Sequence, residues 1–433
     1  MTHTLEDLKS GKLIGSKTLK LACGLKVFPL EILSLADTLE VLDLSDNQLA
    51  ELPESIIKLK HLKVLFFARN NFTTFPIILK EFPVLSMVGF KSNQIHTIPE
   101  NAFPPLLKWL ILTDNKIKKI PKSIGVCHLL QKCALAGNQI EELPDEMASC
   151  LKLELLRVSA NKLKSIPKWL FELPNLSWVA FGGNPFSHRA DIDIDLESFD
   201  WKGFIVKELI GEGASGLISK AIWGLKNEAV AIKVFKGDVT SDGLPEDEME
   251  IAIAAGIHKN LIQVLGKIKS HPEEKSGLIM ELISPDFINL GNPPSMKTCT
   301  RDVFDENSVF NRDELLKIAK SIASVSSQLH RKGINHGDLY AHNILVNKTA
   351  ECLLGDFGAA SFYDINSALA HNIERVEVKA YGCLIEDILN LVTEIEMDSQ
   401  SHNKWKKLIQ DCTISNVTSR LSFSEISTVL SQF

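Results

Sequence analysis

The sequence predicts two domains of different fold class: an α/β solenoid built from short repeated units and, behind it, an α+β domain. Three observations predict this. An apolar frame that ends in asparagine recurs every 22 or 23 residues over roughly residues 14–187. The period then stops, and from Phe204 a strand pattern leads through a glycine-rich turn into a second strand. The chain has 433 residues, more than one ordinary hydrophobic core supports.

The repeated unit is marked by an asparagine and, in most copies, by a proline six residues later. Before the asparagine, as in LEVLDLSDN, apolar residues alternate with others, which predicts a short strand with one buried face. The asparagine side chain can satisfy backbone groups in the following turn, and the proline makes the chain leave the sheet. The asparagines are Asn47, Asn70, Asn93, Asn115, Asn138, Asn161 and Asn184, and the prolines are Pro53, Pro76, Pro99, Pro121, Pro144 and Pro167.

With a degenerate first copy that ends at Pro29, there are about eight units. Because no unit can bury its apolar face alone, we expect the units to stack into a curved solenoid. The frame L-x-x-L-x-L-x-x-N resembles that of leucine-rich repeats over residues 14–187. In such repeats the leucines and asparagines are structural, and function lies on the concave face.

The outward strand positions predict an unusually apolar concave face. Exposed apolar surface of this extent usually marks a protein-binding site, so we expect these residues to touch a protein partner or the chain's own second domain. The alternative is that neighbouring side chains partly bury them. The residues are Phe66, Met87, Trp109, Ile111 and Trp178.

A join over residues 188–202 follows the repeats. Asp191, Asp193 and Asp195 alternate with isoleucines, which fits an edge strand or a cap over the last repeat. The stretch is neither long nor rich in Gly and Ser, so a short linker and docking of the repeats on the second domain are expected.

Composition and charge narrow the class of protein. The net charge of −7 gives no general attraction to nucleic acid or to an anionic membrane. No stretch approaches the roughly 18 apolar residues of a membrane span, and the polar amino terminus does not resemble a signal peptide. The eight cysteines form no C-x-x-C pair, which favours buried free thiols. We therefore expect a cytoplasmic protein.

The second domain opens with a glycine-rich turn in which Gly211, Gly213 and Gly216 form G-x-G-x-x-G. Glycines let backbone N–H groups approach phosphate without interference from Cβ atoms. The motif alone is weak evidence, because dinucleotide-binding folds use it too. Here the turn leads into a strand and not a helix, which argues against that fold.

A lysine in the next apolar strand decides the chemistry. V-A-I-K ends at Lys233, whose charge is costly there unless phosphates and a carboxylate pair with it. The carboxylate is expected on the following helix, where Glu248 and Glu250 compete. Glu248 is favoured, and Glu250 would then be a solvated helix residue.

Three more polar residues follow at fixed spacing: Asp338 and Asn343 in HGDLYAHN, and Asp356 in D-F-G. In this order the motifs resemble those of protein kinases over residues 203–433. The resemblance implies a bilobal domain that uses ATP and Mg²⁺. Asp338 would accept or orient the substrate hydroxyl proton, Asn343 and Asp356 would hold the metal, and the lysine–glutamate pair would complete the catalytic set.

The strand GLIMELI resembles the hinge of protein kinases, with Met280 in the gatekeeper place. Backbone groups from Glu281 to Ile283 would then bind adenine, beside Ile218 and Ala231. The carboxyl-terminal helices look like those of tyrosine-kinase-like serine/threonine kinases, and the combination with repeats looks most like bacterial leucine-rich-repeat protein kinases. Phosphoryl transfer to protein hydroxyls, with serine or threonine as the acceptor, is expected.

Several positions depart from the kinase pattern. Gly337 replaces the arginine that reads a phosphorylated activation loop, and Tyr340 replaces the usual lysine. No A-P-E follows D-F-G, and 18 residues separate Gly358 from Glu377, which stands in the place of a helix Asp. Arg420 loses its usual glutamate partner. Activation by loop phosphorylation and the class of substrate are therefore left open.

Two alternatives follow from these departures. HGDLYAHN also resembles the loop of small-molecule phosphotransferases of the aminoglycoside and choline kinase type, although V-A-I-K, D-F-G and the glycine-rich turn together fit protein kinases better. The other alternative is a scaffold without activity, a pseudokinase whose repeats bind partners. The complete set of metal and phosphate residues argues against it.

Overall fold

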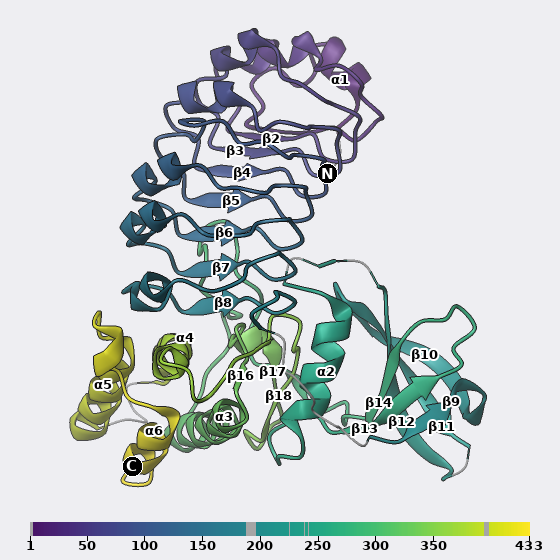
Figure 1. Ribbon diagram of the computed structural model, residues 1–433, viewed down its shortest axis with the longest axis vertical. Helices are drawn as coiled ribbons and strands as arrows, with labels where there is room; N and C mark the ends of the chain where they lie inside the picture. The colour runs from purple at the N-terminus through teal and green to yellow at the C-terminus, as the bar shows by residue number, and fades with distance from the viewer. Residues whose placement is uncertain (1–2, 188–195, 225, 238, 241, 394–397) are drawn as a thin grey trace. The chain divides into compact units, whose positions relative to one another are not determined.

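The chain divides into two units, whose described residues in a computed structural model are 3–187, 196–224, 226–237, 239–240, 242–393 and 398–433 (Figure 1). Met1–Leu173 with Asn184–Phe186 forms the first unit, and Pro174–Gly183 with Ser187–Phe433 forms the second. Among the described residues, no helix has the length and apolar character needed to span a membrane.

Short parallel strands form the sheet of the first unit, as the repeat pattern predicts. Neighbouring strands pair one repeat apart, so that Val41 lies beside Val64 and Leu42 beside Leu65. The middle residue of each strand is fully buried. The strands are β1 (Thr18–Lys20), β2 (Val41–Asp43), β3 (Val64–Phe66), β4 (Met87–Gly89), β5 (Trp109–Ile111), β6 (Lys132–Ala134) and β7 (Leu155–Arg157).

Short 3-10 helices return the chain from one strand to the next, after an initial helix α1 (Leu5–Lys9). Each begins directly after a repeat proline, whose φ between −66° and −71° already suits a helical turn. The proline therefore ends one element and starts the next. The helices are η1 (Leu30–Leu35), η2 (Glu54–Lys58), η3 (Ile77–Glu81), η4 (Lys122–Val126), η5 (Asp145–Ser149) and η6 (Lys168–Glu172).

The repeat asparagines form a buried ladder, as expected. The Asn115 side chain donates to the carbonyl oxygens of Phe90 at 2.9 Å and Leu112 at 3.0 Å. Its oxygen accepts the N–H of Ile95 at 2.9 Å. Each asparagine thus satisfies backbone groups of two repeats that the short strands leave unpaired.

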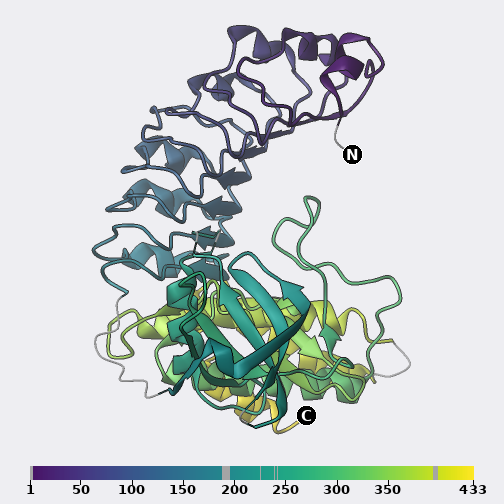
Figure 2. The same cartoon turned by 90° about the vertical axis from the view of Figure 1, so that its right-hand side faces the viewer.

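A six-stranded sheet and one helix make up the first part of the second unit (Figure 2). The strand order is β10-β11-β12-β14-β13-β9, and Trp223, Ile232 and Ile279 are buried at its centre. The predicted alternation of Asp191, Asp193 and Asp195 lies outside the described residues. The elements are β9 (Ser198–Asp200), η7 (Trp201–Gly203), β10 (Phe204–Glu212), β11 (Gly216–Trp223), β12 (Glu228–Phe235), α2 (Pro245–Ala255), β13 (Val264–Lys269) and β14 (Gly277–Glu281).

Helices and two-stranded or three-stranded ribbons make up the rest of the second unit. The strands are β15 (Ile288–Asn289), β16 (Ile334–Asn335), β17 (Ile344–Val346), β18 (Cys352–Leu354) and β19 (Ser361–Phe362). The helices are α3 (Arg312–Arg331), η8 (Ala341–Asn343), α4 (Ala370–Leu389), α5 (Ser399–Thr413), η10 (Val417–Ser419) and α6 (Phe423–Leu430).

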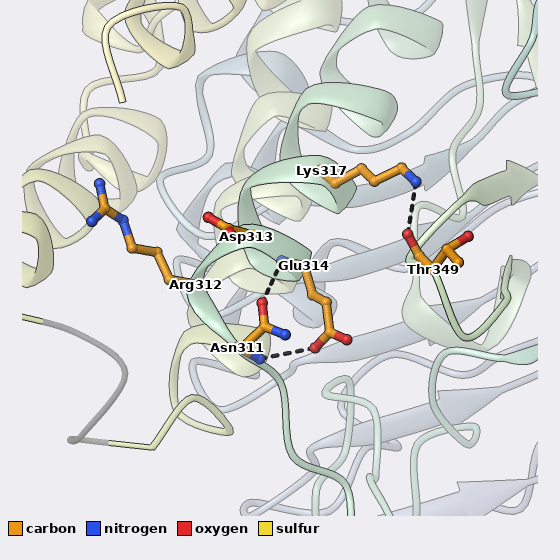
Figure 3. Close-up of a pocket in the computed structure, with 6 residues that line it drawn as sticks. All are labelled: Asn311, Arg312, Asp313, Glu314, Lys317 and Thr349. Atoms are coloured by element: carbon orange, nitrogen blue, oxygen red, sulfur yellow. Dashed lines mark hydrogen bonds between the residues drawn. The ribbon is translucent and has the colours of Figure 1, made fainter.

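The start of α3 is fixed by a capping box (Figure 3). The Asn311 side chain accepts the N–H of Glu314 at 2.9 Å, and the Glu314 carboxylate accepts the N–H of Asn311 at 2.9 Å. One turn later, Lys317 donates to the carbonyl oxygen of Thr349 at 2.7 Å. These bonds hold a helix whose last turn reaches the candidate site through His330.

The last strand of the repeat pattern, β8 (Trp178–Ala180), belongs to the second unit with the rest of Pro174–Gly183. β8 keeps the sequence frame of the repeats and comes last in the strand order β1 to β8, while its segment also bonds residues of the second unit, such as Leu339 and Ser361.

Candidate active site

The glycine-rich turn joins β10 to β11 with its backbone drawn close to β12. The Gly213 N–H donates to the carbonyl oxygen of Gly216 at 3.0 Å. A Cβ atom on Gly216 would lie 2.7 Å from the Val234 oxygen, whereas one on Gly213 would meet nothing within 4 Å. The open space beside Gly213, which has no side chain, suits a phosphate. Gly211 and Ile218 lie opposite each other at the base of the turn.

Lys233 on β12 forms a buried ion pair with Glu248 on α2. The two side chains are 13% and 6% exposed, so water screens their charges poorly. Glu250, the alternative partner, is exposed. Burial raises the pKa of Glu248 above its usual value; the charge of Lys233 opposes this rise, and that of Asp356 adds to it.

The expected adenine strand is β14, next to β12 in the sheet. Met280 lies opposite Ala231 and is half-buried, as is Ile283. The Glu281 N–H donates to the carbonyl oxygen of Gln263 at 2.9 Å, so this donor is already engaged within the sheet.

Asp338 and Asn343 face each other across the loop between β16 and β17. The Asn343 side-chain nitrogen donates to the backbone oxygen of Asp338 at 2.9 Å and to its carboxylate at 2.8 Å. His336 makes a 2.9 Å hydrogen bond through Nε2 to the carbonyl oxygen of Gly355. The loop is thereby joined to the strand that ends just before Asp356.

Glu377 on α4 holds the backbone of the loop that carries Asp338 by hydrogen bonds. Its carboxylate accepts the N–H of Gly337 at 2.6 Å and of His336 at 3.2 Å, and bonds His330 at 2.8 Å. Burial alone would raise the pKa of Glu377, but the hydrogen bonds and charge of His330 outweigh it and hold the pKa below its usual value. Glu377, which stands where protein kinases usually have an aspartate on this helix, therefore still supports the loop backbone by hydrogen bonds.

Asp356 follows β18 with its backbone in the left-handed region, at φ 52°. Its carboxylate accepts the N–H of Gly358 at 3.1 Å. A Cβ atom on Gly358 would lie 3.1 Å from this carboxylate and 3.8 Å from that of Glu248. The Asp356 carboxylate therefore comes close to the lysine–glutamate pair, and a strained aspartate conformation of this kind is typical of functional sites.

The donor set fits a divalent cation that also binds phosphate. With its nitrogen directed at Asp338, Asn343 presents its amide oxygen, and Asp356 presents a carboxylate; Mg²⁺ prefers such oxygens together with those of a substrate phosphate. Among the described residues, no group of three or more His, Cys, Asp and Glu side chains is arranged to hold a metal. A metal held by Asn343 and Asp356 would offset the negative charge of the phosphates.

His342 is a site residue that the sequence reasoning missed. Its Nδ1 bonds the carboxylate of Asp302 at 2.8 Å, and the backbone N–H of His342 reaches the same side chain at 3.2 Å. Burial opposes protonation, but Asp302 outweighs it and the pKa of His342 lies above its usual value. No spacing signal connects two residues forty positions apart, so folding alone reveals the pair.

Tyr340 lies between two aromatic rings. The Trp178 ring is stacked on it at 4.4 Å and 6° between planes, and the His342 ring lies 5.0 Å away on the loop. Tyr340 and Trp178 are 4% and 2% exposed. Tyr340 therefore packs inside the loop and is not exposed to solvent, although it stands where protein kinases usually have a lysine.

The predicted apolar face of the repeats is partly covered. The Phe66 ring lies over Gly89, where a Cβ atom would come within 2.7 Å of it. The ammonium group of Lys132 lies 5.0 Å from the centre of the Trp109 ring, which is 7% exposed. Trp109 is thus not the exposed residue that the frame predicts, because its neighbours pack around it. The other predicted residues of this face in the first unit are half-buried: Phe66, Met87 and Ile111.

Two family models match stretches of the chain. Residues 204–381 match the family model for the protein kinase domain, and residues 38–59 match that for the leucine rich repeat.

Individual relatives match over less than half of the chain. A probable serine/threonine-protein kinase of Dictyostelium discoideum is 28% identical over 42% of this chain and 10% of its own length. Cyclin-dependent kinase 12 of Caenorhabditis elegans is 27% identical over 39% of this chain and 23% of its own. L-type lectin-domain containing receptor kinase V.7 of Arabidopsis thaliana is 30% identical over 38% of this chain and 24% of its own. The chain thus spans about a quarter or less of these relatives.

Proposed function

We propose that this chain, in which a protein kinase domain follows leucine-rich repeats, transfers the γ-phosphoryl group of ATP to serine or threonine hydroxyls of proteins. The domain implies ATP and a divalent metal, and we propose magnesium as the metal because the donors are amide and carboxylate oxygens. The similarity to a probable serine/threonine-protein kinase supports the choice of acceptor.

The observation that carries this proposal is the buried ion pair of Lys233 and Glu248 beside the Asp356 carboxylate. A lysine held in this way has no structural need to be there, since an apolar residue would fill the strand at lower cost. Facing phosphates, the same lysine neutralises charge in a site that is poor in water. The pair therefore supports nucleotide chemistry at this position.

The remaining residues act by positioning. The Asp338 carboxylate, held by the Asn343 amide, would accept or orient the proton of the substrate hydroxyl. Asn343 and Asp356 would hold the metal against the phosphates, with the backbone of the glycine-rich turn over them. Phosphoryl transfer needs little more from protein than this alignment.

We also propose that the repeats bind the protein partner or substrate. Phe66, Met87 and Ile111 keep part of their apolar surface exposed on neighbouring strands, which suits a protein contact. We do not assign this role to Trp178, because its ring packs against Tyr340 in the second unit, which is the other contact expected for the apolar face.

The test is transfer from ATP labelled at the γ-phosphorus, with Mg²⁺ and a generic protein acceptor. We expect labelled phosphoserine or phosphothreonine, and a loss of transfer on the order of 10²–10⁴-fold in each of Lys233→Met, Asp338→Ala and Asp356→Asn. ATP binding should survive in Asp338→Ala. ATP binding without any transfer by the wild type would indicate a scaffold, and transfer to aminoglycosides or choline instead of protein would indicate a small-molecule phosphotransferase.

A further inference from the structure

The segment Pro174–Gly183 lies within the second unit against the loop that carries Asp338. The indole N–H of Trp178 donates to the carbonyl oxygen of Leu339 at 3.2 Å, and its ring covers that of Tyr340 at 4.4 Å, nearly parallel. These two contacts fall on the two residues that follow Asp338. Trp178 therefore fixes the loop immediately beside the proposed catalytic carboxylate.

The backbone of the same segment explains why residue 337 is glycine. The Val179 oxygen accepts a hydrogen bond from the Asn335 side chain at 2.9 Å. A Cβ atom on Gly337 would lie 2.5 Å from this oxygen and 2.6 Å from that of Ala359, and Gly337 has φ 72°. An arginine there would be strained by the left-handed backbone, and its Cβ atom would clash with both oxygens, of which that of Val179 belongs to segment 174–183.

The end of the segment is fastened to the stretch after D-F-G. The hydroxyl oxygen of Ser361 accepts the N–H groups of Phe181 and Gly182, both at 2.9 Å. Ser361 is fully buried. A Cβ atom on Gly182 would come within 3.0 Å of the Ala360 oxygen, so the two backbones are in close contact.

The start of the segment is fastened to the helical part. Lys379 on α4 donates to the Pro174 oxygen and to the Asn175 side chain, both at 2.8 Å. Arg420 also donates to the Pro174 oxygen at 2.8 Å. Arg420, which lacks its usual glutamate partner, thus donates to this segment instead. It also donates hydrogen bonds to the carbonyl oxygens of Ile414 and Arg375.

We infer that residues 174–183 hold the catalytic loop in its working geometry, with Trp178 as a positioning residue for Asp338, so that transfer requires no phosphorylated residue in the loop. The inference rests on the proposed function. At each of the three departures from the kinase pattern, Gly337, Tyr340 and Arg420, the residue is in close contact with this one segment. The 18 residues between Gly358 and Glu377 need not supply that support.

The test uses the full chain, freed of phosphate with a phosphatase, and compares kcat with KM for ATP. Trp178→Ala should lower kcat on the order of 10–10²-fold, because small displacements of a catalytic group cost that much. KM for ATP should stay within about threefold, because the lysine and the glycine-rich turn lie on other elements. Trp178→Phe keeps a stacking ring and should recover most of the loss.

Trp169→Ala is the matched control, since that indole bonds Asp145 in the first unit and should leave both constants unchanged. Ser361→Ala loosens the far end of the segment, and a loss of kcat smaller than that of Trp178→Ala is expected.

Full kcat in Trp178→Ala would overturn the inference while the proposed function stands, and so would wild-type protein that transfers only after a phosphate has been added to it. A joint loss of kcat and of ATP affinity, measured by calorimetry, would also overturn it, since that marks a general structural role. Absence of transfer in the wild type under all conditions would defeat the proposed function itself, and the inference with it.

Discussion

Glu248 and Glu250 stand two residues apart on α2, yet their surroundings are opposite. Glu248 is buried against Lys233, whereas Glu250 is exposed. Glu248→Gln keeps the size of the side chain and removes the charge that directs the lysine. We expect kcat/KM to fall on the order of 10–10²-fold, a scale typical of lost positioning. Steady-state transfer assays measure this.

Glu250→Gln serves as the control for that experiment. It changes the net charge of the chain and of the helix by the same amount, but at an exposed position, where effects on activity and stability are small. An equal loss in both variants would show that helix charge, and not the contact with Lys233, is what matters.

At the residue scale, the sequence predicts the charged groups of the site well, because each has a fixed place in a short motif. Lys233 lies in a strand and Asp356 directly after one, so their surroundings follow from local pattern. The sequence does not decide whether Glu248 or Glu250 pairs with Lys233. Residues two positions apart on a helix point to opposite faces, so a small error in where the helix begins reverses the choice. The stacking of Tyr340 depends on Trp178, 162 positions earlier, which no motif connects.

Among the elements, the asparagine ladder offers a direct comparison at Asn70 and Asn71. The Asn70 side chain donates to the Leu44 oxygen at 2.9 Å and accepts the Leu49 N–H at 2.9 Å, in the interior. Asn71 is exposed. Asn70→Ala leaves these buried backbone groups without partners, so we expect a loss of about 1–3 kcal/mol in the unfolding free energy of the first unit.

Urea unfolding followed by circular dichroism measures that loss as a lower midpoint. Asn71→Ala, one position along the same turn, should change the free energy by less than about 0.5 kcal/mol. Similar midpoints for the two variants would show that the ladder contributes little and that the leucine core alone holds the repeats.

Regular elements are the part of the fold that the sequence predicts best. A period of 22 or 23 residues fixes the strands, since every unit repeats the same requirement for a buried centre. The apolar character of the outward face is also correctly read from the frame. Its exposure is not, because covering contacts such as Lys132 over Trp109 depend on which side chains happen to be neighbours in the stack.

For the molecule as a whole, the boundary between the units cannot be read from periodicity. β8 has the same sequence frame as the other repeat strands, with an asparagine at Asn184, and its pattern predicts nothing different. The difference lies in partners distant in sequence: Ser361, Lys379 and Arg420 all bond the segment that contains β8. A repeat pattern predicts where a strand forms but not which distant residues the strand packs against.

The integration of Pro174–Gly183 into the second unit predicts how a cut chain behaves. A specific protease site placed within residues 188–195 would allow the native protein to be cleaved between this segment and the rest of its unit. The two pieces should stay together in size-exclusion chromatography and keep their transfer activity. They are joined by the buried hydrogen bonds to Ser361 and by the packed ring of Trp178.

The same cut in a chain that carries Trp178→Ala and Ser361→Ala removes both of these anchors, and its pieces should separate at lower concentrations of urea. A cut chain that carries Trp169→Ala instead should separate at the same urea concentration as the cut wild type, because Trp169 contacts Asp145 in the first unit. Pieces that separate without denaturant, in the absence of any substitution, would mean that the segment is held in place only by the continuous chain. Transfer would then depend on an unbroken backbone, and the contacts of Trp178 would be a consequence of the fold and not a support for it.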